Sequence, residues 1–401
     1  MKPIRPLLGT LMAVVILLVA CRDLPPGAVP TTSPLADRPD LKVALIGALT
    51  GPNSGPANRG LEGTRLALDR INEQGELPVG LVAFGVDTRE DPAIAAEAVR
   101  EQVVEDTEVV AAVTWASAPE ADQVHSQLEA AGVPTIDLSP AGIAAEGPGA
   151  AGYRRLVTSD QAQAAAAARV IDVLDPRRVC ISGSDDVRSV RLGRAVTRVL
   201  AHRGVQTQGT LPVEPGIEDR SALAQEIGAS RCQVVFWSGG GADGAVLREA
   251  LDGTADDQVR LVGGDAMRND AYLTHAGPGA DGTLSVCPCV DVTGGSDLPL
   301  QAFIQEYQAK FGGPPGVYSA EGWDAGQMII EAVRAGARTR GDLVAALDDL
   351  DAADGLARVY RFSAEGGLEP AARNVSVSEV TAGQWVSLGS EDDAVKVLRS
   401  R

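Results

Sequence analysis

Short apolar runs alternate with amphipathic stretches along most of the chain. The first run, 41–47, ends at a glycine, and after a turn-rich loop the leucines and isoleucine of 61–72 recur at helical spacing. Short runs of the first kind predict strands, and stretches of the second kind predict helices. The same pattern continues with predicted strands at 81–87, 109–113 and 133–138 and predicted helices at 92–104 and 118–131.

The alternation restarts with an alanine-rich helix predicted at 159–174. It continues with strands at 179–182, 206–211, 234–238 and 259–263, separated by helices at 190–203, 221–227 and 242–251. The last part predicts helices at 298–311, 320–335 and 340–350, then strands of antiparallel appearance at 357–362, 375–381 and 384–387. Two successive strand–helix runs predict an α/β fold with two parallel sheets, each covered by helices on both faces. Such sheets bind ligands at the carboxyl ends of their strands, in the crevice between lobes.

The first forty residues depart from this pattern. Lys2 and Arg5 precede an apolar run at 11–20 that is too short to span a membrane comfortably and ends directly before Cys21. This arrangement resembles the lipobox at which bacterial lipoproteins are cleaved and diacylated on the cysteine. The alternative is an uncleaved anchor in which Cys21 is incidental.

We therefore interpret residues 1–20 as a lipoprotein signal peptide and the proline-rich residues 21–40 as a tether. A lipid at Cys21 would hold the exported domain at the outer face of the bacterial cytoplasmic membrane. The formal charge of −19 argues against nucleic acid as a partner. No other segment is apolar enough to enter a membrane, which excludes a polytopic membrane protein.

Export also bears on the other four cysteines. Cys180 and Cys232 lie in or beside predicted strands, and if those strands are neighbours in one parallel sheet, a disulfide between them is feasible. Cys287 and Cys289 flank Pro288, and a bridge across that residue would be strained but allowed. A metal site is the competing interpretation, but it needs more soft or imidazole ligands than the chain offers nearby. No metal or other cofactor is expected.

Several motifs then occur in the order of a known family. Residues 46–52 read Ile-Gly-Ala-Leu-Thr-Gly-Pro and are followed by Gly60 and Gly63. The later motifs are Asp87, Asp91-Pro92, Gly132-Val133-Pro134, Ser139-Pro140, Gly263-Gly264-Asp265 and the segment from Tyr318 to Ala325. Over about residues 41–388 the chain resembles type 1 periplasmic binding proteins of the leucine/isoleucine/valine-binding group, which feed ABC transporters.

The resemblance implies two Rossmann-like lobes joined by a three-strand hinge that close on a ligand like a clamp. With crossovers near Val157, Cys287 and Val359, the first lobe comprises 41–157 with 288–358. The second lobe comprises 158–287 with 359–401. In this family a ligand carboxylate meets backbone N–H groups and hydroxyls of the first lobe, and its ammonium meets carbonyls and an acidic residue of the second.

By position, the resemblance implies ligand contacts from Trp115, Ser117, Ala141, Gly142, Arg188, Asp265 and Trp323. Several of these have a plainer interpretation. Asp265 could cap a helix at 267–273, Ser117 could cap the helix after it, and the two tryptophans could be core residues. Arg188 could face solvent or pair with Asp185 or Asp186.

The chain also departs from the family pattern. Ile143 stands where the family usually has threonine, Arg188 lies near the place of a Tyr-Gly pair, and glycines at 239–241 replace common aromatic residues. Fewer apolar walls and a guanidinium fit a polar or anionic ligand better than a branched aliphatic side chain.

The function expected is therefore that of an extracytoplasmic lipoprotein that captures an amino acid or related polar metabolite and delivers it to an ABC permease. A hydrolase is the rival from another class, but the three histidines lie in no recognisable nucleophile or metal motif. An enzyme is not expected. A second rival is a sensor or scaffold lipoprotein of the same fold that does not serve transport.

Overall fold

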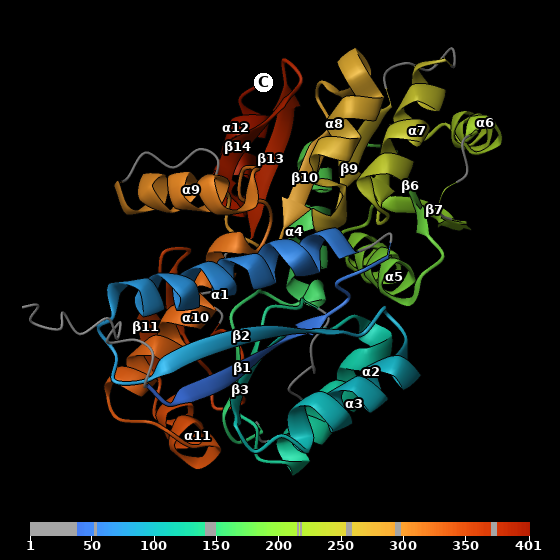
Figure 1. Cartoon of the computed structure of the whole chain (residues 1–401). Coiled ribbons are helices and arrows are strands. Elements are labelled where there is room, and N and C mark those ends of the chain that lie inside the picture. Colours follow the sequence, from blue (N-terminus) through green and yellow to red (C-terminus); the bar gives the residue numbers. More distant parts are fainter. Residues whose placement is uncertain are drawn as a thin grey trace, which may run out of the picture. The chain divides into compact units, whose positions relative to one another are not determined.

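The computed structural model describes residues 38–51, 54–140, 150–214, 216, 219–253, 259–292, 298–369 and 375–401 (Figure 1). They contain two separate sheets of mainly parallel strands, as the alternating pattern predicts. In this part of the chain no helix is long and apolar enough to cross a membrane.

The first sheet is parallel throughout, in the order β2-β1-β3-β4-β5. Its strands are β1 (Asp40–Gly47), β2 (Gly80–Asp87), β3 (Val109–Trp115), β4 (Thr135–Asp137) and β5 (Tyr153–Arg155). Alternate side chains of β1 enter two different cores, Val43 and Leu45 on one face and Ala44 and Ile46 on the other. Burial on both faces explains why its sequence is a continuous apolar run.

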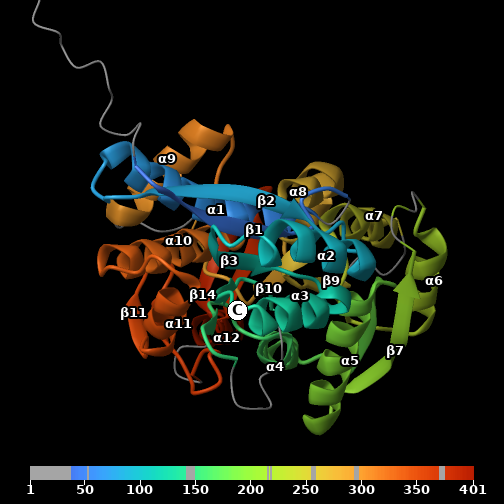
Figure 2. The same ribbon diagram turned by 60° about the horizontal axis from the view of Figure 1, so that its bottom comes forward.

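Helices cover both faces of this sheet, and together they make the first lobe. One face carries α2 (Pro92–Val99), η1 (Arg100–Val104) and α3 (Ala118–Ala130). The other carries α1 (Ser54–Gln74), α9 (Leu298–Phe311), α10 (Ser319–Arg334) and α11 (Arg340–Asp348). Segments from both ends of the chain therefore build one core, and Figures 1 and 2 show α1 and α10 side by side.

Glycines allow α1 and α10 to approach closely. A methyl group at Gly63 would lie 2.0 Å from the carbonyl oxygen of Ser319, and one at Gly322 would lie 1.8 Å from that of Gly60. The Thr64 hydroxyl donates across the same contact to the Gly322 carbonyl at 2.8 Å. The glycines at 60 and 63 in the opening motif thus serve helix packing.

The second sheet has the order β14-β13-β10-β9-β8-β6-β7. Its parallel strands are β6 (Arg178–Ser184), β7 (Gln206–Val213), β8 (Val234–Trp237), β9 (Arg260–Gly263) and β10 (Leu284–Cys287). The antiparallel strands β13 (Ser376–Thr381) and β14 (Gln384–Ser390) extend it beyond β10. Its strands also alternate between two cores, with Phe236 in one and Trp237 in the other.

The helices around this sheet complete the second lobe. They are α4 (Asp160–Val173), α5 (Val187–His202), α6 (Ser221–Ala229), α7 (Gly241–Asp252), α8 (Asp270–Ala276) and α12 (Glu391–Arg399), with short η2 (Asp265–Met267) and η3 (Gly277–Ala280). Most begin and end within a few residues of the predicted bounds, but β5, β10 and α12 were not predicted from the sequence.

A small antiparallel pair, β11 (Ala352–Asp354) with β12 (Val359–Arg361), follows α11. Tyr360, Phe362 and Leu368 lie in the core of the first lobe, so the chain remains with that lobe about ten residues beyond Val359. It then enters β13 of the second sheet at Ser376.

The described residues contain two disulfides. One joins Cys180 in β6 to Cys232, which lies just before the neighbouring strand β8. The other joins Cys287, the last residue of β10, to Cys289. The predicted lipidation residue, Cys21, lies outside the described residues.

Candidate functional site

A buried ion pair lies at the carboxyl ends of the second lobe's parallel strands. Asp265 follows β9 and is 1% exposed. Arg188 is the second residue of α5, the helix that follows β6. Its Nη2 lies 2.9 Å from Oδ1 of Asp265 and 3.0 Å from Oδ1 of Asp160. One guanidinium therefore faces two carboxylates.

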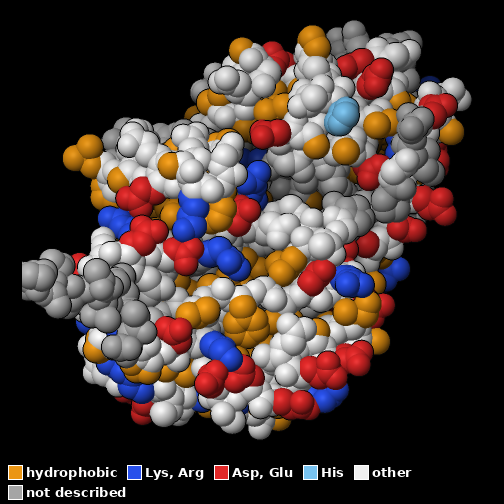
Figure 3. All heavy atoms as spheres, viewed as in Figure 1, with side chains coloured by type: hydrophobic (Ala, Val, Ile, Leu, Met, Phe, Trp, Pro, Cys, Tyr) orange, Lys and Arg blue, Asp and Glu red, His pale blue; other side chains and the backbone are white. Residues whose placement is uncertain are grey.

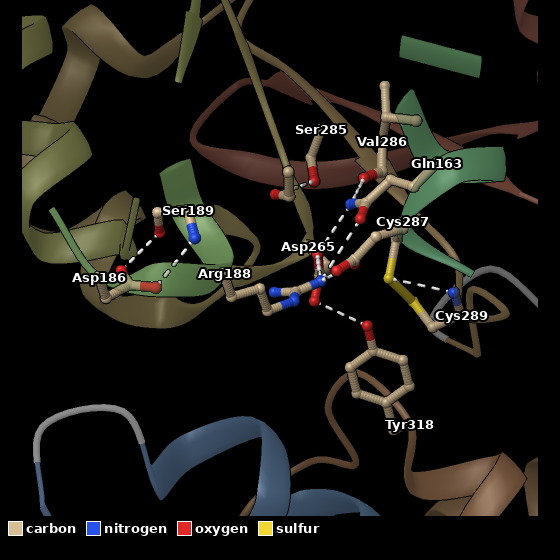
Figure 4. A network of polar contacts seen from close by, with 12 residues as sticks. Gln163, Asp186, Arg188, Ser189, Asp265, Ser285, Val286, Cys287, Cys289 and Tyr318 are labelled. Atoms are coloured by element: carbon tan, nitrogen blue, oxygen red, sulfur yellow. Dashed lines mark hydrogen bonds and ion pairs between the residues drawn. A yellow bond between two sulfur atoms is a disulfide. The ribbon is translucent and has the colours of Figure 1, made fainter. Parts of the chain in front are cut away.

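Two more side chains complete the hydrogen bonding of Asp265 (Figure 4). Gln163 Nε2 donates to Oδ1 at 2.8 Å and also to the Val286 carbonyl at 2.8 Å, which fixes its orientation. The hydroxyl of Tyr318 donates to Oδ2 at 2.7 Å. Both carboxylate oxygens of Asp265 are thus engaged.

Burial and the neighbouring charges shift the pKa values of the ionisable groups in this cluster. Burial alone would raise the pKa of Asp265, but Arg188 and the hydrogen bonds from Tyr318 and Gln163 outweigh it, and the pKa is lowered. Burial opposes the charge of Arg188 as well, yet Asp160 and Asp265 raise its pKa well above the ordinary value. Burial raises the pKa of Asp160.

Tyr318 brings the first lobe into the cluster. It precedes α10 with a left-handed backbone, φ 68°, and its ring packs against that of Trp115 with the centroids 6.3 Å apart. Its hydrogen bond to Asp265 therefore joins the two lobes. A second link is the hydrogen bond from the Asp160 backbone N–H to the Pro140 carbonyl at 3.1 Å.

The structure brings Trp115, Arg188 and Asp265 into this one cluster. Ser117 caps α3, two residues beyond Trp115, and its backbone N–H donates to Glu120 Oε1 at 2.9 Å. Trp323 lies elsewhere, packed edge-to-face on Phe303 and under the Arg70 guanidinium. Ala141 and Gly142 lie outside the described residues.

Two plainer interpretations of the sequence are wrong. Arg188 pairs with Asp160 and Asp265 rather than with Asp185 or Asp186, because Asp186 instead caps α5 by accepting from Ser189. Asp265 caps no helix through its side chain, since Asn269 caps α8 by accepting from Tyr272. The sequence reasoning also missed Asp160, Gln163 and Tyr318.

A recess of about 390 Å³ opens beside the cluster, between α1 and α8, on the face drawn in Figure 3. Its walls come from both lobes. The first lobe contributes Arg59 of α1 and Val317, and the second contributes Asp265 and Asn269. Val290, in the passage that follows β10, also lines the recess.

Buried ion pairs hold that passage between the lobes. Glu321 Oε1 accepts from the Val290 backbone N–H at 2.7 Å and from Arg358 Nη2 at 2.9 Å. Arg268 Nη2 lies 2.5 Å from Asp291 Oδ1. These charges and the Cys287–Cys289 disulfide fix the chain where it leaves the second sheet.

Among the residues that the structure describes, no group of three or more histidine, cysteine, aspartate or glutamate side chains could hold a metal ion. The chemistry of the cluster is that of recognition by charge and hydrogen bonding at a recess between two lobes.

Comparison with known proteins places this geometry in context. A family model described as "Periplasmic binding protein" matches residues 40–384. The Leu/Ile/Val-binding protein BraC3 of Rhizobium johnstonii is 26% identical over 259 residues, which are 63% of this chain and 68% of that protein.

Solved structures show the same fold. The leucine-binding protein LivK of Thermotoga maritima superposes with a TM-score of 0.74 at 20% identity, over 87% of this chain and 98% of that one. A solute-binding protein of an ABC transporter from R. palustris, in complex with benzoate, superposes with a TM-score of 0.73 at 19% identity, over 88% and 96%.

Proposed function

Since the chain belongs to the periplasmic binding protein family, we propose that it captures a small solute between its two lobes and delivers it to an ABC importer. The solute is an amino acid or a related polar or anionic metabolite. One observation carries the proposal: Asp265, Arg188 and Tyr318 join the two lobes through buried polar contacts beside a recess.

The lobes act as a clamp in this proposal. The first is 41–157 with 288–358, the second is 158–287 with 359–401, and residues 359–368 pack on the first. A ligand that touches both lobes binds the closed arrangement more tightly than the open one, and therefore shifts the equilibrium toward closure. An importer that recognises the closed shape then receives only loaded protein.

Attachment to the membrane belongs to the same proposal. Cleavage before Cys21 and diacylation of that cysteine would keep the protein at the outer face of the cytoplasmic membrane, beside its permease. Mass spectrometry of the membrane-bound protein should find a diacylated Cys21 as its first residue. An unmodified Cys21 still joined to residues 11–20 would favour the uncleaved anchor.

Ligand binding is tested by the melting temperature of the purified protein with leucine, benzoate and other small amino and carboxylic acids. A ligand present at 100 times its Kd adds about 2.7 kcal/mol to the free energy of unfolding. Tyr318→Phe removes the hydrogen bond from Tyr318 to Asp265, one of the contacts between the lobes, and should weaken binding at least tenfold. Tyr272→Phe is the matched control, because Tyr272 bonds Thr283 within the second lobe.

A panel in which no solute raises the melting temperature would contradict the proposal. Equal binding by the two tyrosine variants would show that the contact between Tyr318 and Asp265 has no part in capture.

A further inference from the structure

The guanidinium of Arg188 lies 2.9 Å from Asp265 and so takes the position that the ammonium group of an amino-acid ligand would need. We propose, building on the proposed function, that the recess takes small carboxylates with no cationic group, and that Arg188 sets this preference. Such a preference would distinguish an amino acid from the carboxylic acid that has the same carbon skeleton and no amino group.

Most of the hydrogen-bonding capacity of Asp265 is already used within the protein. A carboxylate offers about four lone-pair positions, and three of those on Asp265 accept from Gln163, Arg188 and Tyr318. Its charge faces Arg188 at 2.9 Å in a fully buried setting. The remaining lone-pair position lies on Oδ2, and an ammonium bound there would sit close to the like charge of Arg188, which opposes its binding. Displacing Arg188 instead would also break its ion pair with Asp160.

The other acidic residue of the recess does not replace it. Asp270 lies at the start of α8, and its side chain is exposed to solvent. Water and salt screen an exposed carboxylate, so it offers a ligand cation much less than a buried one. No other acidic side chain lines the recess within the described residues.

Two buried N–H groups of the cluster point to an acceptor. Arg188 Nε and Trp115 Nε1 have no hydrogen-bond partner among the described residues. Trp115 is 5% exposed, and its ring rests on Tyr318, the residue that bonds Asp265. A buried donor without a partner costs about 1–3 kcal/mol. Neither residue lines the recess, so a ligand carboxylate would satisfy these donors only by reaching past Asp265 into the cluster.

The remaining walls fit an apolar body. Val290, Val292 and Val317 line the recess, together with the prolines at 56, 314 and 315. A volume of about 390 Å³ suits a small molecule rather than a peptide. The ligand class is therefore a small monocarboxylate with an aliphatic or aromatic body.

Matched pairs of compounds test this class on the unmodified protein. Calorimetric titration would compare leucine with 4-methylpentanoate and phenylalanine with 3-phenylpropanoate, which differ only in the amino group. One of the two pairs will bind more tightly than the other. Within that pair, we expect the carboxylic acid to bind at least tenfold more strongly than the amino acid. Tighter binding of the amino acid would overturn the inference and leave the proposed function standing.

Arg188→Met tests the residue itself. Without the guanidinium, Asp265 is free to meet an ammonium, so the preference within a pair should shift at least tenfold toward the amino acid. Arg191→Met is the matched control, because Arg191 lies on the same helix, is exposed and is not part of the cluster. An unchanged preference in Arg188→Met would overturn the role of Arg188.

Removal of Arg188 leaves a buried charge that could prevent folding. In that case the double variant Arg188→Met/Asp265→Asn removes the buried ion pair and leaves only Asp160, whose side chain is 20% exposed. It should bind the acid and the amino acid of a pair within threefold of each other. A retained tenfold preference for the acid would overturn the inference. If the unmodified protein binds none of the four compounds, both the inference and the proposed capture of such solutes fail.

Discussion

The two disulfides close loops of very different length, and this difference predicts different contributions to stability. Cys180 and Cys232 are 52 residues apart in the sequence, whereas Cys287 and Cys289 are two apart. In the chain-entropy model, a loop of the first size lowers the entropy of the unfolded chain by about 14 cal/mol/K, which is about 4 kcal/mol at 25 °C. The short loop contributes only about 1 kcal/mol in the same model.

The perturbation is replacement of both cysteines of one bridge by alanine. Strand β6 pairs with β8 through backbone hydrogen bonds, so the native strands should stay together without the Cys180–Cys232 bridge. The loss then arises in the unfolded chain. With an unfolding entropy of about 2.1 cal/mol/K per residue, 4 kcal/mol lowers the melting temperature of a unit the size of 39–401 by about 5 °C.

Differential scanning calorimetry of the wild type and of the two double alanine variants measures both effects. We expect the Cys180/Cys232 variant to melt about 5 °C lower and the Cys287/Cys289 variant to melt less than 2 °C lower. A reductant should lower the melting temperature of the wild type. It should not change the melting temperature of a variant that lacks both bridges. Equal losses for the two bridges would refute the argument from loop length.

Three further predictions concern the packing and the buried charges. Gly63→Ala should lose about 1–3 kcal/mol by overpacking against the Ser319 carbonyl, as measured by urea unfolding, whereas Gly55→Ala, which has open space, should lose none. Burial raises the pKa of Asp324 to about 7, so this carboxyl binds a proton in the folded state and has lost it in the unfolded state between about pH 4 and pH 7. The wild type should therefore lose stability relative to Asp324→Asn as the pH rises through that window. If the melting temperatures of the two proteins change equally with pH, the raised pKa of Asp324 is contradicted. Glu321→Gln should lose about 3–5 kcal/mol, because it removes the carboxylate that lies 2.9 Å from the buried Arg358 guanidinium, and Glu321→Gln/Arg358→Met should recover part of the loss.

The apolar pattern predicts the elements that bury their own apolar residues. The helix at 298–311 has the predicted bounds, and the strands of both sheets other than β5 and β10 fall close to theirs. The pattern missed β5, because two of its three residues are arginines, and they are buried through partners distant in sequence. Arg154, for example, donates to the carbonyls of Asp348 and Leu350. Burial of this kind depends on the tertiary fold and leaves no period in the sequence.

Of the cluster, the sequence analysis singled out Trp115, Arg188 and Asp265, but it missed Asp160, Gln163 and Tyr318 and predicted none of the contacts. Arg188 and Asp265 are 77 positions apart, and their pairing depends on two loops meeting at the ends of β6 and β9. Gln163 is one of two glutamines at the start of α4, and only its burial among the alanines, which the structure shows, sets it apart from Gln161. Tyr318 stood within a recognised motif, but its role depends on a left-handed backbone that a tyrosine rarely adopts.

The packing of α1 against α10, and of β10 against β13, has a consequence for how the protein is made. The core of the first lobe needs residues 298–368, and that of the second needs 375–398. A nascent chain that has reached residue 290 therefore lacks part of both cores, although it already contains the sequences of the ten strands β1 to β10. Neither lobe can reach its final stability before synthesis is nearly complete, so the chain stays loosely folded for most of that time. A polypeptide that must pass through a membrane unfolded gains from that delay.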